Sequence, residues 1–135
     1  MIGLSRTMSA MNSAGQVAAL IAALLHVAIF AMESVLFSRP AVRARFHVGE
    51  AEVAAVRPWA FNQGFYNLFL AVGTLAGLIL LHTGGYGQAG RALVVLGCAS
   101  MLGAALVLIG TDRRMAQAAL MQGLVPLIGL LLLMF

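Results

Sequence analysis

Charged side chains are scarce in this sequence, and lysine is absent. Only 9% of the 135 residues are charged, whereas 62% are hydrophobic. A soluble domain of this size carries about a quarter charged residues, so the composition excludes that class. The single cysteine, Cys98, can form no internal disulfide and lies within an apolar run, where we expect it to serve packing.

All eight basic residues are arginines, and the formal net charge is +4. A basic protein can bind nucleic acid, but these arginines lie between apolar runs, where membrane topology alone explains them. We therefore expect the lipid bilayer to be the partner and expect no nucleic acid.

Four apolar runs have the length of roughly 20 residues that a helix needs to cross the hydrocarbon core of a bilayer. Their predicted bounds are about 17–37, 59–81, 92–110 and 116–135, with a link at 38–58. The first run is too long for the apolar region of a signal peptide. We predict an all-α polytopic membrane protein in which residues 1–135 form a single membrane domain, a bundle of four transmembrane helices.

The arginines also predict how the bundle is oriented. Six of the eight lie in the link at 38–58 or in the turn at 111–115, and only Arg6 and Arg91 lie on the other side. Because positive residues are retained in the cytoplasm, both termini are expected on the non-cytoplasmic side. The expected location is the bacterial cytoplasmic (inner) membrane, with several passes.

Polar side chains gather at the predicted cytoplasmic ends of the first, second and fourth spans, and the fourth contributes Gln117 and Gln122. The stretch "FNQGFYN" (61–67) opens the second span, and at 100° per residue its four polar side chains fall within an arc of about 140°. In the first span, His26 and Glu33 are seven residues apart and share one face. Gly73 and Gly77 in "GTLAG" form a pattern that lets another helix approach. The short segment "GEAEVAAV" (49–56) is predicted to form a separate short helix.

These positions predict a polar pocket that is open toward the cytoplasm. The candidate catalytic residues are Glu33 and His26. The candidate ligand-binding residues are Glu33, His26, Asn62, Gln63, Tyr66, Asn67 and Gln122. We expect no metal and no cofactor, because no HxxxH, CxxC or ExxH spacing and no phosphate loop occurs.

Each of these residues also has a structural explanation. Glu33 lies about one turn from the end of its span and could reach the interface. The amides could hold helices together without binding a ligand. A lone histidine such as His26 is more often a satisfied residue of a bundle than a metal ligand.

The stretches "ESVLFSRPAVRARF", "EAEVAAVRPWAFNQGFYNLFLAVG" and "QGLVP" resemble a bacterial four-helix membrane family catalogued as domain of unknown function 1304. The resemblance covers nearly the whole chain, and the Asn-Gln-Gly-x-Tyr-Asn motif is its most specific part. Ser34 and Val35 are smaller than the residues expected after the glutamate of the first span. The resemblance implies the four-helix fold and the polar site, but no activity.

Three kinds of function fit these observations. We favour a cytoplasm-facing pocket within the membrane that binds, and could transform, a small amphipathic or lipid-like molecule. A proton-coupled exporter would need polar lining on both sides of the midplane, and the outer half has little. A non-catalytic membrane subunit or assembly partner would use the polar groups only for packing. Whether the protein is an enzyme, and whether it forms a homo-oligomer or joins a larger membrane complex, stays open.

Site-directed labelling tests the predicted orientation. Cysteines placed at Ala41 and Thr111 should react with an impermeant maleimide from the cytoplasmic side, and a cysteine at Gly85 from the other side. Labelling of the Gly85 position from the cytoplasm would show that the bundle has the opposite orientation.

Overall fold

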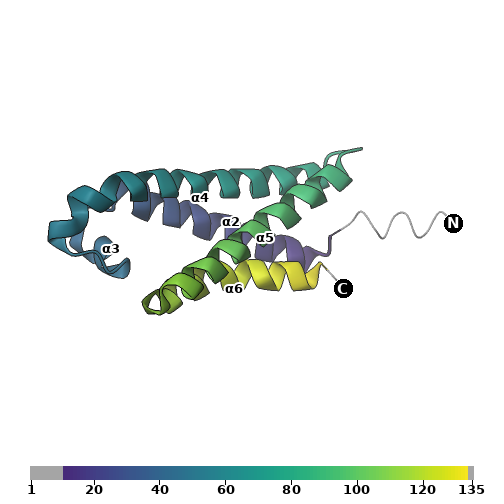
Figure 1. Cartoon of the computed structure of the whole chain (residues 1–135). Coiled ribbons are helices and arrows are strands. Elements are labelled where there is room, and N and C mark those ends of the chain that lie inside the picture. The colour runs from purple at the N-terminus through teal and green to yellow at the C-terminus, as the bar shows by residue number, and fades with distance from the viewer. Residues whose placement is uncertain (1–10, 134–135) are drawn as a thin grey trace.

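The computed structural model describes residues 11–133, and within this range it confirms the predicted four-helix fold (Figure 1). The helices are α2 (Ser13–Phe30), continued by the π-helical segment η1 (Ala31–Val35), α4 (Val53–Leu81), α5 (Gly87–Thr111) and α6 (Ala116–Leu132). All four are long and apolar enough to cross a membrane, and residues 11–133 contain no β-strand. The chain is therefore a multi-pass membrane protein.

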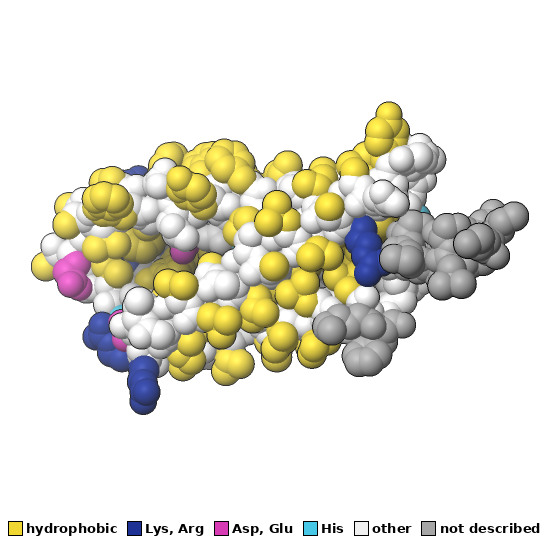
Figure 2. Space-filling view, turned by 45° about the vertical axis from the view of Figure 1, so that its right-hand side comes forward, with side chains coloured by type: hydrophobic (Ala, Val, Ile, Leu, Met, Phe, Trp, Pro, Cys, Tyr) yellow, Lys and Arg dark blue, Asp and Glu magenta, His cyan; other side chains and the backbone are white. Residues whose placement is uncertain are grey.

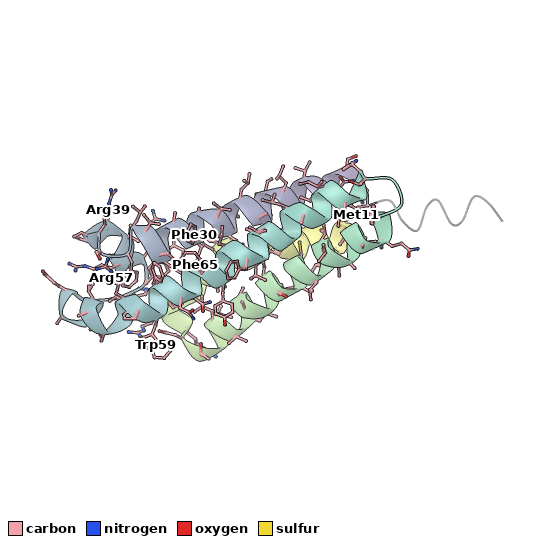
Figure 3. All side chains as sticks on the ribbon, turned by 90° about the horizontal axis from the view of Figure 1, so that it is seen from above. Met11, Phe30, Arg39, Arg57, Trp59 and Phe65 are labelled. Carbon is pink, nitrogen blue, oxygen red and sulfur yellow. The ribbon has the colours of Figure 1, made fainter. Side chains whose placement is uncertain are left out.

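The four helices form a bundle in which α2 packs on α4 and α6, and α5 packs on the same two helices from the other side. The start of α2 and the end of α6 meet at one end of the bundle, where Asn12 Nδ2 donates a hydrogen bond of 2.6 Å to the carbonyl oxygen of Leu132. The short helix α3 (Pro40–Arg45) lies at the opposite end (Figure 1). Arg39 and Arg57 also lie at that end, far from Met11 (Figure 3).

The interior of the bundle is built from small side chains, and the large apolar ones face outward. The buried apolar residues within the spans are Ala18, Ala19, Ala22, Ala23, Ala71, Val94, Cys98, Met101, Ala105 and Ala119. By contrast, Leu24 is 55% exposed and Phe69 is 64% exposed. This distribution suits a lipid environment, because lipid solvates large apolar side chains and small interior residues let helices approach closely.

Helices α4 and α5 approach most closely where glycine faces glycine. A Cβ atom at Gly77 would lie 2.8 Å from the carbonyl oxygen of Gly90, and a Cβ atom at Gly97 would collide with the hydroxyl of Thr74. Gly73, the other glycine of the predicted small-residue pattern, has no atom of a neighbouring helix within 4 Å of its Cβ position. Only the second glycine of that pattern therefore makes the close contact.

The helix bounds differ from the predicted spans mainly around the link. Helix α4 begins at Val53, six residues before Trp59, and continues through Pro58. Proline removes one backbone donor, and near the start of a helix this costs a single bond of the ladder while the alanines around it favour helix. Most of the segment 49–56 is helical, as predicted, but it forms no helix of its own: the 3₁₀ turn η2 (Glu50–Glu52) leads directly into α4. Helix α5 likewise begins at Gly87, five residues before the predicted start.

The glycine contact can be tested with two substitutions in the same helix. Gly77→Ala forces a methyl group against the backbone of α5 and should lower the free energy of unfolding by about 1–3 kcal/mol. Gly73→Ala meets open space and should be neutral or stabilise the helix by up to about 1 kcal/mol. Unfolding by SDS titration, followed by circular dichroism, measures both. Equal effects of the two substitutions would contradict this packing.

Candidate functional site

A cavity of about 470 Å³ lies at the arginine-rich end of the bundle. Its walls come from the end of α2, from η1, and from α4, α5 and α6, and the segment after α3 contributes to its rim. Figure 2 shows a hollow at this end, walled largely by hydrophobic side chains, with an acidic side chain visible inside. Six of the lining residues are polar or charged, namely Glu33, Arg45, Gln63, Asn67, Thr111 and Gln122. The other nine are apolar.

Glu33 reaches this cavity from a π-helical segment, which interrupts the α-helical ladder of the first span. The amide of Leu36 donates to the carbonyl oxygen of Ala31 at 2.8 Å, a bond that spans five residues rather than four. Single π-turns of this kind inside α-helices often occur at functional sites. The sequence pattern did not indicate this segment.

Asn67 holds the Glu33 carboxylate from the facing helix. Its Nδ2 group donates to Glu33 Oε2 at 2.8 Å and to the carbonyl oxygen of Gln63 at 3.2 Å. Asn67 is itself buried. Glu33 is therefore in direct contact with the polar motif of the second span, through the last residue of that motif.

The π-helical segment packs directly on α4 because residue 64 is a glycine. A Cβ atom there would collide with Ser34 Oγ and would lie 3.1 Å from Glu33 Cβ. Ser34 Oγ in turn donates to the carbonyl oxygen of Phe61 at 2.8 Å. Close beside this contact, the rings of Phe30 and Phe65 pack edge to face, with their centroids 5.1 Å apart (Figure 3). Gly64 and Ser34 thus fix the position of Glu33, although neither was among the predicted site residues.

Four of the seven predicted site residues line the cavity, and three do not. The four in its wall are Glu33, Gln63, Asn67 and Gln122. Asn62 and Tyr66 lie on the exposed side of α4, where Tyr66 is 61% exposed.

His26, the third residue outside the cavity wall, lies deeper in the bundle. It is only 1% exposed, and its Nδ1 donates to the carbonyl oxygen of Ala22 at 2.9 Å. Such a bond to the preceding turn is the satisfied arrangement expected of a structural histidine. The histidine therefore does not extend the site.

A hydrogen bond connects the segment at the rim of the cavity to the turn between α5 and α6. Helix α3 ends at Arg45, and the turn after it contains His47, whose φ of 56° lies in the left-handed region. The amide of Val48 donates back to the carbonyl oxygen of Arg43. His47 Nε2 then donates to the carbonyl oxygen of Arg114 at 3.2 Å. The Arg114 side chain donates to both oxygens of Asp112, and this bond holds the pKa of that carboxyl below its usual range. The rim residues Arg45 and Phe46 are held in place by these contacts.

The chemistry available in the cavity is that of one carboxylate, three amides, one hydroxyl and, at the rim, the guanidinium of Arg45. Within residues 11–133, no three His, Cys, Asp or Glu side chains lie close enough together to hold a metal ion. The Thr111 hydroxyl is engaged with the carbonyl oxygens of Val107 and Leu108. Glu33 is the only carboxylate of the lining, so any proton transfer to a bound molecule would start there.

Comparison with known proteins gives one match. A family model described as "Protein of unknown function (DUF1304)" matches residues 20–134, a range that includes all the lining residues of the cavity. No curated protein and no solved structure matches the chain.

The packing of the π-helical segment on α4 can be tested by a double-mutant cycle. Gly64→Ala should lower the free energy of unfolding by about 1–3 kcal/mol, because the new methyl group meets Ser34 Oγ. In a Ser34→Ala background the same substitution should cost measurably less, since the colliding oxygen is gone. Unfolding in SDS measures all four proteins, and strictly additive effects would show that the two residues do not meet.

Proposed function

Since the chain belongs to the DUF1304 family, whose description names no activity, we propose its function from the cavity: it binds a small amphipathic or lipid-like molecule within the membrane, with the polar end of that molecule at Glu33. The observation that carries this proposal is the position of Glu33, a carboxylate in the wall of a cavity of about 470 Å³ whose lining is otherwise mostly apolar. Small-molecule sites have this size and this mixture of a largely apolar wall with a few placed polar groups.

The side of the membrane follows from the arginines. Arg39, Arg43, Arg45, Arg57, Arg113 and Arg114 belong to the segments at the cavity end of the bundle, and Arg91 follows the turn at the other end. By the positive-inside rule, the cavity opens toward the cytoplasm of a bacterial inner membrane. Trp59 is 76% exposed near the same end, which suits a residue at the membrane interface.

The cavity also argues against a purely structural role for the polar cluster. Residues that only hold helices together are enclosed by those helices, whereas Glu33, Gln63 and Gln122 face a space large enough for a ligand. An exporter is supported less well, because the buried polar residue of the other half, Thr74, is closed off by Gly97 and bonds to its own helix.

A substitution that fills the cavity tests the proposal. Ala104 lines the cavity from α5 and is exposed to it, so Ala104→Phe should occupy the space without disturbing the buried core. Leu106→Phe is the matched control, because Leu106 is 61% exposed on the same helix and does not line the cavity. Thermal unfolding in detergent, with and without native lipid extract, measures binding as stabilisation.

The wild-type protein and Leu106→Phe should be stabilised by the extract by several degrees, and Ala104→Phe should lose that stabilisation. If the extract stabilises Ala104→Phe as much as wild type, the ligand binds elsewhere and the cavity has no binding role. A wild-type protein that shows no stabilisation by any fraction of the extract would favour the non-catalytic subunit.

A further inference from the structure

One oxygen of the Glu33 carboxylate has no hydrogen-bond donor among the described residues. Asn67 donates to Oε2, and within residues 11–133 no donor lies within hydrogen-bond distance of Oε1. Yet no fully buried side-chain oxygen or nitrogen in this range lacks a partner. Oε1 is therefore not fully buried between the helices. Because Glu33 lines the cavity, this oxygen is accessible from the cavity.

The carboxylate also has no cationic partner among the described side chains. No Arg or His nitrogen of residues 11–133 lies within 4.0 Å of its oxygens. Arg43 lies instead 3.9 Å from Glu50, and Arg114 pairs with Asp112 at 2.9 Å. Arg45 contributes to the cavity rim but is exposed, with its charge available to water. An unpaired charge within a membrane span is costly even on lenient scales.

Two further acceptors face the same space. The side chains of Gln63 and Gln122 line the cavity from α4 and α6, and neither makes a side-chain hydrogen bond within residues 11–133. Each amide oxygen can accept a hydrogen bond from a ligand. Away from the exposed Arg45 at its rim, the cavity thus offers one carboxylate and up to three oxygen acceptors, surrounded by apolar wall.

We infer that the cavity is a site for an amphipathic primary amine in its ammonium form, an assignment that rests on the proposed binding function. An ammonium group has three donors and no acceptor, and its positive charge supplies what Glu33 lacks. The alkyl or aryl part of such a molecule would pack on the apolar lining. An anionic head would be repelled by Glu33, and an alcohol would leave the charge uncompensated.

The test compares three probes of equal chain length that differ in charge: octylammonium is positive, octanol neutral and octanoate negative. Each is titrated onto the purified protein in a non-ionic detergent at neutral pH. Octylammonium should bind the wild-type protein at least about tenfold more tightly than the other two, because hydrogen bonds to charged groups are the stronger ones. Glu33→Gln keeps the shape and the acceptor and removes the charge, so it should abolish this advantage. Ala104→Phe should weaken all three probes, and Leu106→Phe none.

The outcomes separate this inference from the function on which it rests. If octanol or octanoate binds as tightly as octylammonium, or if Glu33→Gln retains the preference for the cation, the ligand is not an ammonium. The binding function then still stands, provided that Ala104→Phe weakens the probes. If no probe binds, or if Ala104→Phe weakens none, both are wrong.

An ammonium group can come from a free amine or from the headgroup of an ethanolamine phospholipid. Thermal unfolding in phosphatidylcholine nanodiscs, with and without phosphatidylethanolamine, distinguishes these sources. Stabilisation by phosphatidylethanolamine in wild type but not in Glu33→Gln identifies the lipid. Stabilisation by octylammonium alone identifies a free amine, and either result supports the inference.

Discussion

The structure depends on how closely α4 and α5 approach each other at the end of the bundle away from the arginines. There the backbones pack at Gly77 and Gly90, and one turn further Thr74 fits against Gly97. Later in α5 the helix packs on α6 instead, where a Cβ atom at Gly123 would lie 2.6 Å from Ala105 Cβ. Helix α5 therefore crosses α4 at an angle and diverges from it, as Figure 1 shows. The residues of α5 that follow, including Ala104, Val107 and Leu108, form one wall of the cavity.

A second close contact holds the opposite wall in place. Gly64 lets the π-helical segment approach α4, and the bond from Ser34 to the carbonyl oxygen of Phe61 fixes its position. The extra residue in this turn changes the direction of the side chains that follow, relative to an unbroken α-helix. Helix α5 thus packs closely on α4 near its own start, and the π-helical segment packs closely on α4 at Gly64. Between the later part of α5 and the π-helical segment a space is left, and Glu33 lies at its edge.

The sequence predicted the four spans well and the site only in part, for a physical reason. Apolar length and arginine placement report on the bilayer, which acts on each helix separately. Which face of a helix meets its neighbours depends on small residues, and these give a weak signal. At 100° per residue, the buried stripe of α4, formed by Gly64, Asn67, Ala71, Thr74 and Gly77, is centred roughly 70° from the centre of the polar arc. Asn67 belongs to both, whereas Asn62 and Tyr66 lie on the far side of that arc and are exposed.

The choice of glutamate at position 33 is itself informative about the cavity. If the side chain served only to bond α2 to α4, glutamine would accept the same hydrogen bond from Asn67 without placing a charge inside the membrane. Polar contacts between membrane helices are worth about 0.6 kcal/mol on average, well below the cost of roughly 2.5–3.5 kcal/mol for an isolated charge. The exposed Glu50 and the half-buried Asp112, both outside the spans, have arginine partners within 4.0 Å, although water could stabilise them unaided. Glu33, which water stabilises less, has none among the described residues. A carboxylate whose charge would cost more than its structural bond contributes, and that has no counter-ion among the described residues, is the feature from which we infer an ammonium ligand.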